Sequence, residues 1–286
     1  MPIHTQDYRH WEGTLNQHKR TRWWIIAKAE LKLLAKRKIV RLIVAIPPVI
    51  YILAHGILIY VLNFIPGEID LFDIDNEFFQ GFVFRILPFP TAFLLALVVI
   101  FGGAGLISDD LKHNSLSLYL SKPISWKDYL IGKFAVIGIL LLCMTLVPGL
   151  LLFLEQALLT DEPFLQGYFW LPFSIVIYSV IITVITGLLM LVFSSLTTNL
   201  RYATIGFCAV WFGLPVVELI LKGVFRTSSV AIVSIWANFD RLGSTLFGTS
   251  SDYDIHWSLS FLFLVALGAG CILVLRHRIR AVEIVK

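Results

Sequence analysis

The stretch FWLPFSIVIYSVIITVITGLLMLVF, residues 169–193, contains no charged side chain. An α-helix rises 1.5 Å per residue, so about 20 apolar residues cross the ~30 Å hydrocarbon layer of a membrane. The strands of a membrane β-barrel are shorter, about ten residues, and alternate between apolar and polar positions. The stretch therefore predicts a transmembrane helix.

Five further runs of this kind lie along the chain, over residues 42–65, 86–107, 134–154, 202–221 and 257–275. Hydrophobic residues make up 58% of the 286 residues, which exceeds the ~45–50% of soluble domains. We expect an all-α polytopic membrane protein in which residues 1–286 form a single transmembrane domain with six spanning helices. One or two short helices are expected in the longest outer loop, 222–256.

The basic residues predict the orientation of these helices. If the N-terminus is cytoplasmic, the inner segments hold 19 Lys and Arg residues and the outer segments hold 4. Cytoplasmic loops of membrane proteins carry an excess of Lys and Arg. Both termini are therefore expected on the cytoplasmic side of the plasma membrane. We expect no cleavable signal peptide, because residues 1–41 contain no apolar core of the required kind.

Residues 21–38, TRWWIIAKAELKLLAKRK, predict an amphipathic helix before the first span. Its lysines Lys28, Lys32 and Lys36 follow one another at i, i+4 and i+8. The neighbouring apolar stripe consists of Trp23, Trp24, Ala27, Leu31, Leu34 and Ala35, with Ile26 and Leu33 off the stripe. Such a helix lies in the inner headgroup plane, with indoles at the interface and ammonium groups facing anionic lipid. The alternative is a plain cytoplasmic extension of the first span.

The first span contains Pro47 and Pro48, which remove two backbone donors and predict a kink. The kink is either a hinge or a static feature of shape. His55 is expected to be a hydrogen-bonded interior histidine, because no partner for a haem or metal stands in another span core. The three cysteines each fall inside a span and are expected to pack as small apolar residues.

The sequence lacks the common motifs for nucleotide binding and for catalysis. A phosphate-binding loop needs Gly-Lys-Ser or Gly-Lys-Thr, whereas Gly132 and Lys133 are followed by Phe134. The HExxH and GxSxG patterns are also absent. Asp109 and Asp110 are adjacent, so on a helix they point ~100° apart and cannot act as a facing acid and base. We expect no catalytic residue, metal or cofactor in this chain.

The most informative polar segment is GLISDDLKHNSLSLYLSKPISWKDYLIGK, residues 105–133. Ser108 followed by two acids predicts an N-cap with first-turn carboxylates. A short helix should follow, with Leu111, Ser115, Leu118 and Tyr119 on one face, and Pro123 should end it.

Ser125 and Asp128 then form a capping box, S-x-x-D, which restarts a helix that continues into the third span. An ordinary capped hairpin between two spans is the simpler interpretation of this segment.

The same segment resembles the ABC-2 type permeases, the membrane subunits of one class of ATP-binding-cassette exporter. The likeness extends to SSLTTN after the fourth span and to the basic tail RHRIRAVEIVK. The amphipathic segment, six spans and long last outer loop also match, so the resemblance covers nearly the whole chain. It implies an ABC-2 or type V exporter-like fold.

The resemblance also implies partners. Two permease halves, identical or different, would bind two cytoplasmic ATPase subunits that hold the ATP and magnesium. The turn between spans two and three would be the coupling helix that enters a cleft of the ATPase, and the amphipathic helix would lean on the same partner. The coupling residues implied are Ser108, Asp109, Asp110, Lys112, His113, Asn114 and Ser115.

Other functions remain as alternatives. A membrane anchor or assembly scaffold needs no transport of its own, and a haem-bearing anchor would show paired histidines in its spans. An intramembrane enzyme would show polar catalytic residues at matching depth, and a secondary carrier would move its substrate without ATP.

Overall fold

The computed structural model describes residues 22–64, 91–115, 119, 124–159, 167–251 and 253–283. Within these ranges the chain forms helices and no strand, which confirms the all-α fold. The elements are α1 (Arg22–Lys36), α2 (Lys38–Phe64), α4 (Thr91–Gly103), α5 (Gly105–Lys112), α7 (Trp126–Leu159), α9 (Leu171–Leu196), α10 (Leu200–Phe225), the 3₁₀ helix η2 (Ser228–Val233), α11 (Ile235–Phe247) and α12 (Trp257–Glu283).

Among the described residues, five segments are long and apolar enough to cross a membrane: Phe93–Lys112, Trp126–Leu159, Leu171–Leu196, Leu200–Phe225 and Trp257–Ile279. They coincide with the second to sixth predicted spans. The first predicted span coincides with α2, which has 27 residues and is therefore about 40 Å long. Several side chains of α2, including that of His55, lie outside the described residues, as do residues 86–90.

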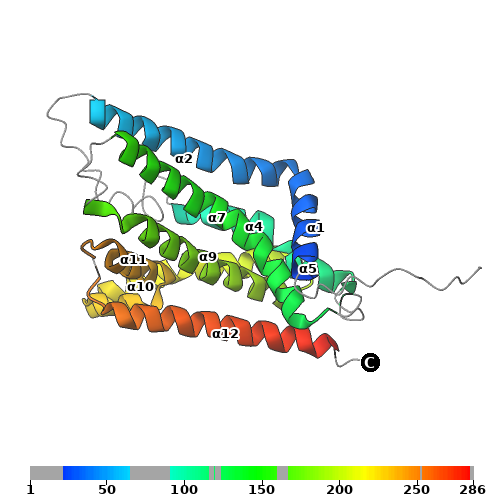
Figure 1. Cartoon of the computed structure of the whole chain (residues 1–286). Helices are drawn as coiled ribbons and strands as arrows, with labels where there is room; N and C mark the ends of the chain where they lie inside the picture. Colours follow the sequence, from blue (N-terminus) through cyan, green and yellow to red (C-terminus); the bar gives the residue numbers. More distant parts are fainter. Residues whose placement is uncertain are drawn as a thin grey trace, which may run out of the picture.

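The long helices run side by side, and α7 and α9 form the centre of the bundle (Figure 1). Both are rich in buried side chains, and small residues let them approach closely. A Cβ atom on Gly187 would lie 3.0 Å from the Phe134 ring. The helix α1 crosses the bundle at one end, next to α5 and the start of α7 (Figure 1).

The opposite end is closed by η2 and α11, which fall in the predicted outer loop 222–256. Trp211 of α10 is fully buried, and its ring lies 5.5 Å from that of Phe207 and 6.1 Å from that of Trp236 on α11. Aromatic pairs at such distances add to the stabilisation from buried area. The short helix is therefore packed into the bundle.

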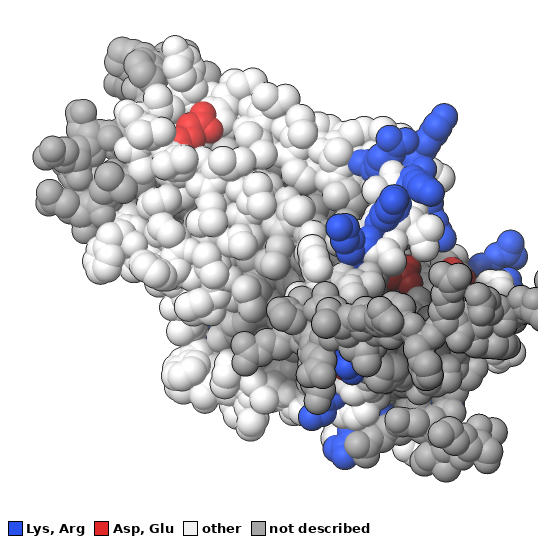
Figure 2. Space-filling model, turned by 45° about the vertical axis from the view of Figure 1, so that its right-hand side comes forward, with Lys and Arg blue, Asp and Glu red and all other residues white. Residues whose placement is uncertain are grey.

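Lys and Arg side chains gather at the end that contains α1 and the start of α2, and the middle of the molecule is nearly free of charge (Figure 2). We call this the basic end. The helices α2, α10 and α12 expose large apolar side chains, among them Leu53, Ile57, Leu219, Ile220, Leu262 and Leu273. This surface suits contact with lipid hydrocarbon.

The prediction that a helix begins at Ser108 is wrong. Helix α4 passes through a turn at Ala104 directly into α5, which ends at Lys112. Ser108 lies inside this helix, and the acids lie in its second half instead of its first turn. The chain then turns at Asn114, whose φ of 53° is left-handed, so the single helix expected to run on towards Tyr119 is interrupted.

The helix restart at Ser125 is confirmed. The Ser125 amide donates to the Asp128 carboxylate at 3.1 Å, and the Asp128 amide donates to the Ser125 hydroxyl at 3.2 Å. These reciprocal bonds are the capping box, and α7 continues from there without interruption for 34 residues. Helix α2 likewise continues through Pro47 and Pro48, and their role as a hinge stays a prediction.

Helix α1 is amphipathic, but its buried face differs from the predicted stripe. Ile26, Ala27 and Leu34 are buried, whereas Trp24 is 42% exposed. The buried side packs on α7, so protein contacts decide which apolar residues face inward. The predicted lysine row of Lys28, Lys32 and Lys36 is exposed, and Trp23 is half-buried.

Candidate functional site

A buried lysine joins three helices at the basic end. Lys133 of α7 is 1% exposed, and its Nζ lies 2.5 Å from Glu30 Oε1 on α1 and 2.7 Å from Asp110 Oδ2 on α5. The Tyr129 hydroxyl donates to the same Asp110 oxygen at 2.7 Å. We call these four residues the Lys133 network.

Aromatic rings cover the ammonium group. The ring centroids of Tyr129 and Tyr119 lie 5.5 and 5.8 Å from Lys133 Nζ, within the range of a cation–π contact. The pKa of Tyr119 is raised because burial and the two nearby carboxylates outweigh the opposing effect of Lys133. Its phenol therefore stays protonated at neutral pH.

The Lys133 network holds three helices in one arrangement. Two carboxylates share one cation, so removing the cation would leave two negative charges in half-buried positions. Losing one partner of a buried ion pair costs about 3–5 kcal/mol, more than most single contacts. A displacement of α5 relative to α1 or α7 therefore has to break a charged contact.

A close backbone approach fixes α1 on α7 beside the network. A Cβ atom on Gly132 would lie 2.9 Å from the Trp23 carbonyl oxygen and 3.0 Å from Ile26 Cβ. Both distances are too short for a side chain without displacement of a neighbour. Glycine at this position lets Glu30, one turn further along α1, reach Lys133.

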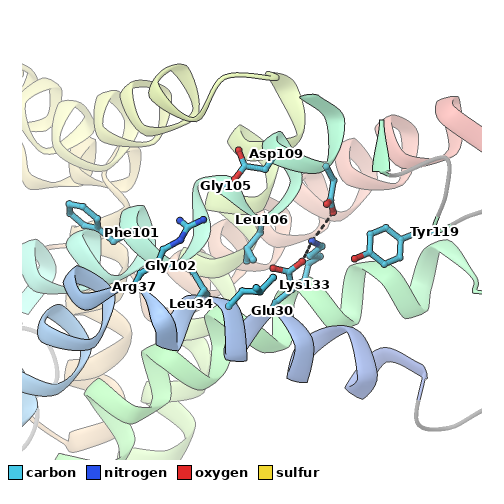
Figure 3. Close-up of a pocket in the computed structure, with 12 residues that line it drawn as sticks. Glu30, Leu34, Arg37, Phe101, Gly102, Gly105, Leu106, Asp109, Tyr119 and Lys133 are labelled. Carbon is cyan, nitrogen blue, oxygen red and sulfur yellow. Dashed lines mark hydrogen bonds and ion pairs between the residues drawn. The ribbon is translucent and has the colours of Figure 1, made fainter. Parts of the chain in front are cut away.

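A cavity of about 240 Å³ opens beside the Lys133 network, between α1, the α4–α5 segment and α7. Glu30 and Lys133 lie together on one side of it, and Arg37 and Phe101 lie towards the other (Figure 3). Asp109 also lines the cavity and, among the described residues, forms no ion pair. Charged and apolar groups thus meet in one hollow at the basic end.

A second contact connects α5 with the centre of the bundle. The Ser194 hydroxyl of α9 accepts from the amides of Ile107 and Ser108, both at 3.0 Å, and donates to the Ala104 carbonyl at 2.8 Å. Ser108 Oγ donates to the same carbonyl at 2.8 Å. A side chain of α9 thus replaces backbone hydrogen bonds at the junction of α4 and α5. Insertion of a side chain into the hydrogen bonds of a helix commonly bends the helix. We call this contact the Ser194 clamp.

Comparison with protein-family models matches residues 24–239 to "ABC-2 family transporter protein". The matched segment includes most of α1, the α4–α5 segment, the Lys133 network and the Ser194 clamp, and it covers most of the chain. This chain belongs to the ABC-2 transporter family. It is accordingly a membrane transport component of the ABC-2 permease type. Comparison with curated proteins gives no significant match.

The coupling residues expected for an ABC-2 permease divide into two groups in the structure. Lys112, His113 and Asn114 are exposed at the end of α5, and we call them the coupling tip. The other residues lie further inside: Asp110 is occupied by the Lys133 network, Ser108 is fully buried at the Ser194 clamp, and Asp109 and Ser115 are half-buried.

Three residues of this site were not predicted as functional: Glu30, Lys133 and Ser194. The sequence contains a signal for the first pair. Glu30 is the one acid within the basic segment 21–38, and Lys133 stands at the start of a long apolar run. An acid and a base in such positions need partners when they are buried. Among the described residues, no three His, Cys, Asp or Glu side chains group as metal ligands.

Proposed function

We propose that this chain is the permease subunit of an ABC exporter whose ATP is hydrolysed by separate cytoplasmic ATPase subunits. The observation that carries the proposal is the connection of an exposed coupling tip to two other helices through Lys133. The tip, Lys112 to Asn114, follows within a few residues of Asp110, which contacts Lys133 directly.

In the proposed mechanism, the ATPase binds the coupling tip and moves it when ATP closes the ATPase pair. Asp110 transmits the movement to Lys133 on α7 and to Glu30 on α1, and the Ser194 clamp transmits it to α9. Since α7 and α9 form the centre of the bundle, a rigid shift of α5 reaches the core of the membrane domain. Exposed Lys28, Lys32 and Lys36 on α1 would meet anionic lipid or the ATPase.

The proposed assembly contains two permease halves and two ATPases in the plasma membrane, with both termini cytoplasmic. The gathering of Lys and Arg at the basic end supports this orientation. ATP and magnesium would be bound by the ATPase subunits.

The test is coexpression of the chain with the ATPase encoded beside its gene, followed by purification through a tag on the chain. We expect the ATPase to copurify, and we expect the double variant Lys112→Glu/His113→Glu to reduce its recovery severalfold. Ser250→Glu is the matched control, because Ser250 is exposed just after α11, at the opposite end of the molecule from the coupling tip. An ATPase that fails to copurify with the native chain contradicts the proposal, and so does a tip variant that behaves like the control.

A further inference from the structure

An apolar groove runs along the surface between α9 and α12. Two hollows of about 380 and 340 Å³ lie there, and the second extends to the start of α7. Val184, Leu188 and Ile272 line both hollows, so the two are continuous. We call the combined feature the α9–α12 groove.

The length of the groove equals about one leaflet of a bilayer. On α12 it extends from Phe261 to Ile272, which is roughly 16 Å at 1.5 Å per residue. The hydrocarbon core of a bilayer is ~30 Å thick, so one leaflet accounts for about half of it. Small side chains keep the groove open: Gly268 lies close to Ile185, where a Cβ would be 3.3 Å from Cδ1, and Ala269 lines the wall.

Cations stand where the groove reaches the basic end. Lys127 lines the groove, and its Nζ lies 5.9 Å from the centroid of the Trp126 ring. The guanidinium carbon of Arg276 lies 5.9 Å from the same ring, and Arg276 follows Ile272 by one turn of α12, on the same face. Both cations are exposed and form no ion pair with any residue that the structure describes. The adjacent acid, Asp128, is held by Ser125.

We propose that the α9–α12 groove binds one anionic glycerophospholipid. An acyl chain lies along the hydrocarbon lining, the phosphate binds Lys127 and Arg276, and the Trp126 indole lies at the interface between headgroup and hydrocarbon. Tryptophan is enriched at that depth, and cations near the membrane surface attract anionic headgroups.

The charges favour a lipid over a second copy of this chain. In a membrane dimer related by an axis along the membrane normal, the two copies place their basic ends at the same depth. Packing the groove of one copy on the other would bring Lys127 and Arg276 near the partner's cations, and such like charges repel. An anionic phosphate neutralises them.

The test measures lipid binding to the purified full-length chain by native mass spectrometry. The probes are phosphatidylglycerol and phosphatidylcholine with the same acyl chains. Both lipids offer a phosphate, but the choline ammonium of phosphatidylcholine cancels its charge and repels the two cations. We therefore expect phosphatidylglycerol to bind about tenfold more tightly or better. The double variant Lys127→Gln/Arg276→Gln should remove this preference. The control Lys38→Gln/Arg41→Gln removes two exposed cations at the start of α2 and should retain it.

A second pair of variants tests the hydrocarbon part. Ala269→Trp fills the groove and should weaken binding of both lipids about tenfold. Gly270→Trp should leave binding unchanged, because Gly270 is exposed on the opposite face of α12 and an added side chain there meets open space. Both sites are exposed, so neither variant has to disturb the core.

Three results would overturn the proposal. One is equal binding of the two lipids by the native chain. Another is an Ala269→Trp variant that binds lipid like the native chain or changes only the dimer mass, which would assign the groove to a second copy. The third is displacement of the lipid by millimolar inorganic phosphate, which would show that the cations recognise phosphate without the hydrocarbon.

Discussion

Lys133 is a cation that the protein places out of contact with water and surrounds with its own counter-charges. Its position in a helix that continues into the membrane makes an unpaired charge costly there. Glu30 and Asp110 supply compensation from two other helices, and the tyrosine rings shield the ammonium from the side. The stability of the basic end therefore depends on one side chain.

We predict that Lys133→Met lowers stability by about 3 kcal/mol, because it leaves two half-buried carboxylates without a cation. Thermal unfolding of the purified protein in detergent measures the effect as a large fall in Tm. Lys32→Met is the control, since Lys32 is exposed on α1, and it should change stability by about 0.5 kcal/mol or less.

The neutral triple variant Lys133→Met/Glu30→Gln/Asp110→Asn distinguishes a stability loss caused by unpaired charge from one caused by lost packing. We expect it to recover a substantial part of the lost stability, because the uncompensated negative charges are gone. A triple variant as unstable as Lys133→Met alone would show that the loss comes from packing, and would contradict the electrostatic account.

At the scale of elements, the junction of α4 and α5 depends on a hydroxyl from α9. Ser194→Ala removes the acceptor for two buried amides, and each buried group left without a partner costs about 1–3 kcal/mol. We predict faster hydrogen exchange at the amides of Ile107 and Ser108 and a lower Tm.

The neighbouring serine provides the control. Ser195 is equally buried, but its hydroxyl donates within its own helix, to the Val192 carbonyl. Ser195→Ala should therefore leave exchange in α5 unchanged. If both variants raise exchange alike, the Ser194 clamp does not hold the junction.

The elements show what local sequence can and cannot predict. The spans follow from uninterrupted apolar runs, and the start of α7 follows from the capping box at Ser125, because both patterns act within a few residues. Ser108 misled the prediction because a serine followed by acids has the same composition at a helix start and inside a helix that continues. The pairing of Lys133 with Glu30 joins residues 103 positions apart, so no local pattern reveals it.

At the scale of the whole molecule, the two ends differ in their Lys and Arg side chains. At the end closed by α11, Lys222 pairs with Glu218 at 2.7 Å and lies 4.1 Å from the Tyr253 ring, and Arg241 donates to the Ile255 carbonyl at 2.6 Å. At the basic end, many cations are exposed. Arg226 at the α11 end is exposed as well, so the ends differ mainly in the number of their cations, and an excess at one end is what a cytoplasmic basic end predicts.

Labelling with a membrane-impermeant maleimide tests the orientation. In a chain with its three cysteines replaced, we predict that Ser250→Cys reacts in intact cells and that Lys112→Cys reacts only after the cells are opened. Both positions are exposed, so accessibility alone does not distinguish them. The reverse pattern would invert the topology and place the coupling tip outside the cell.

The residues of the Lys133 network are synthesised in a definite order. Glu30 and Asp110 precede Lys133 in the chain, Glu30 by 103 residues, so at 5–20 residues per second it is synthesised roughly 5–20 s earlier. Both carboxylates have left the ribosome before the lysine enters the translocon. Both counter-ions are thus available when Lys133 emerges, so the lysine need not insert as a bare charge. The order of the three residues makes insertion of the α7 lysine a late step that the earlier helices prepare.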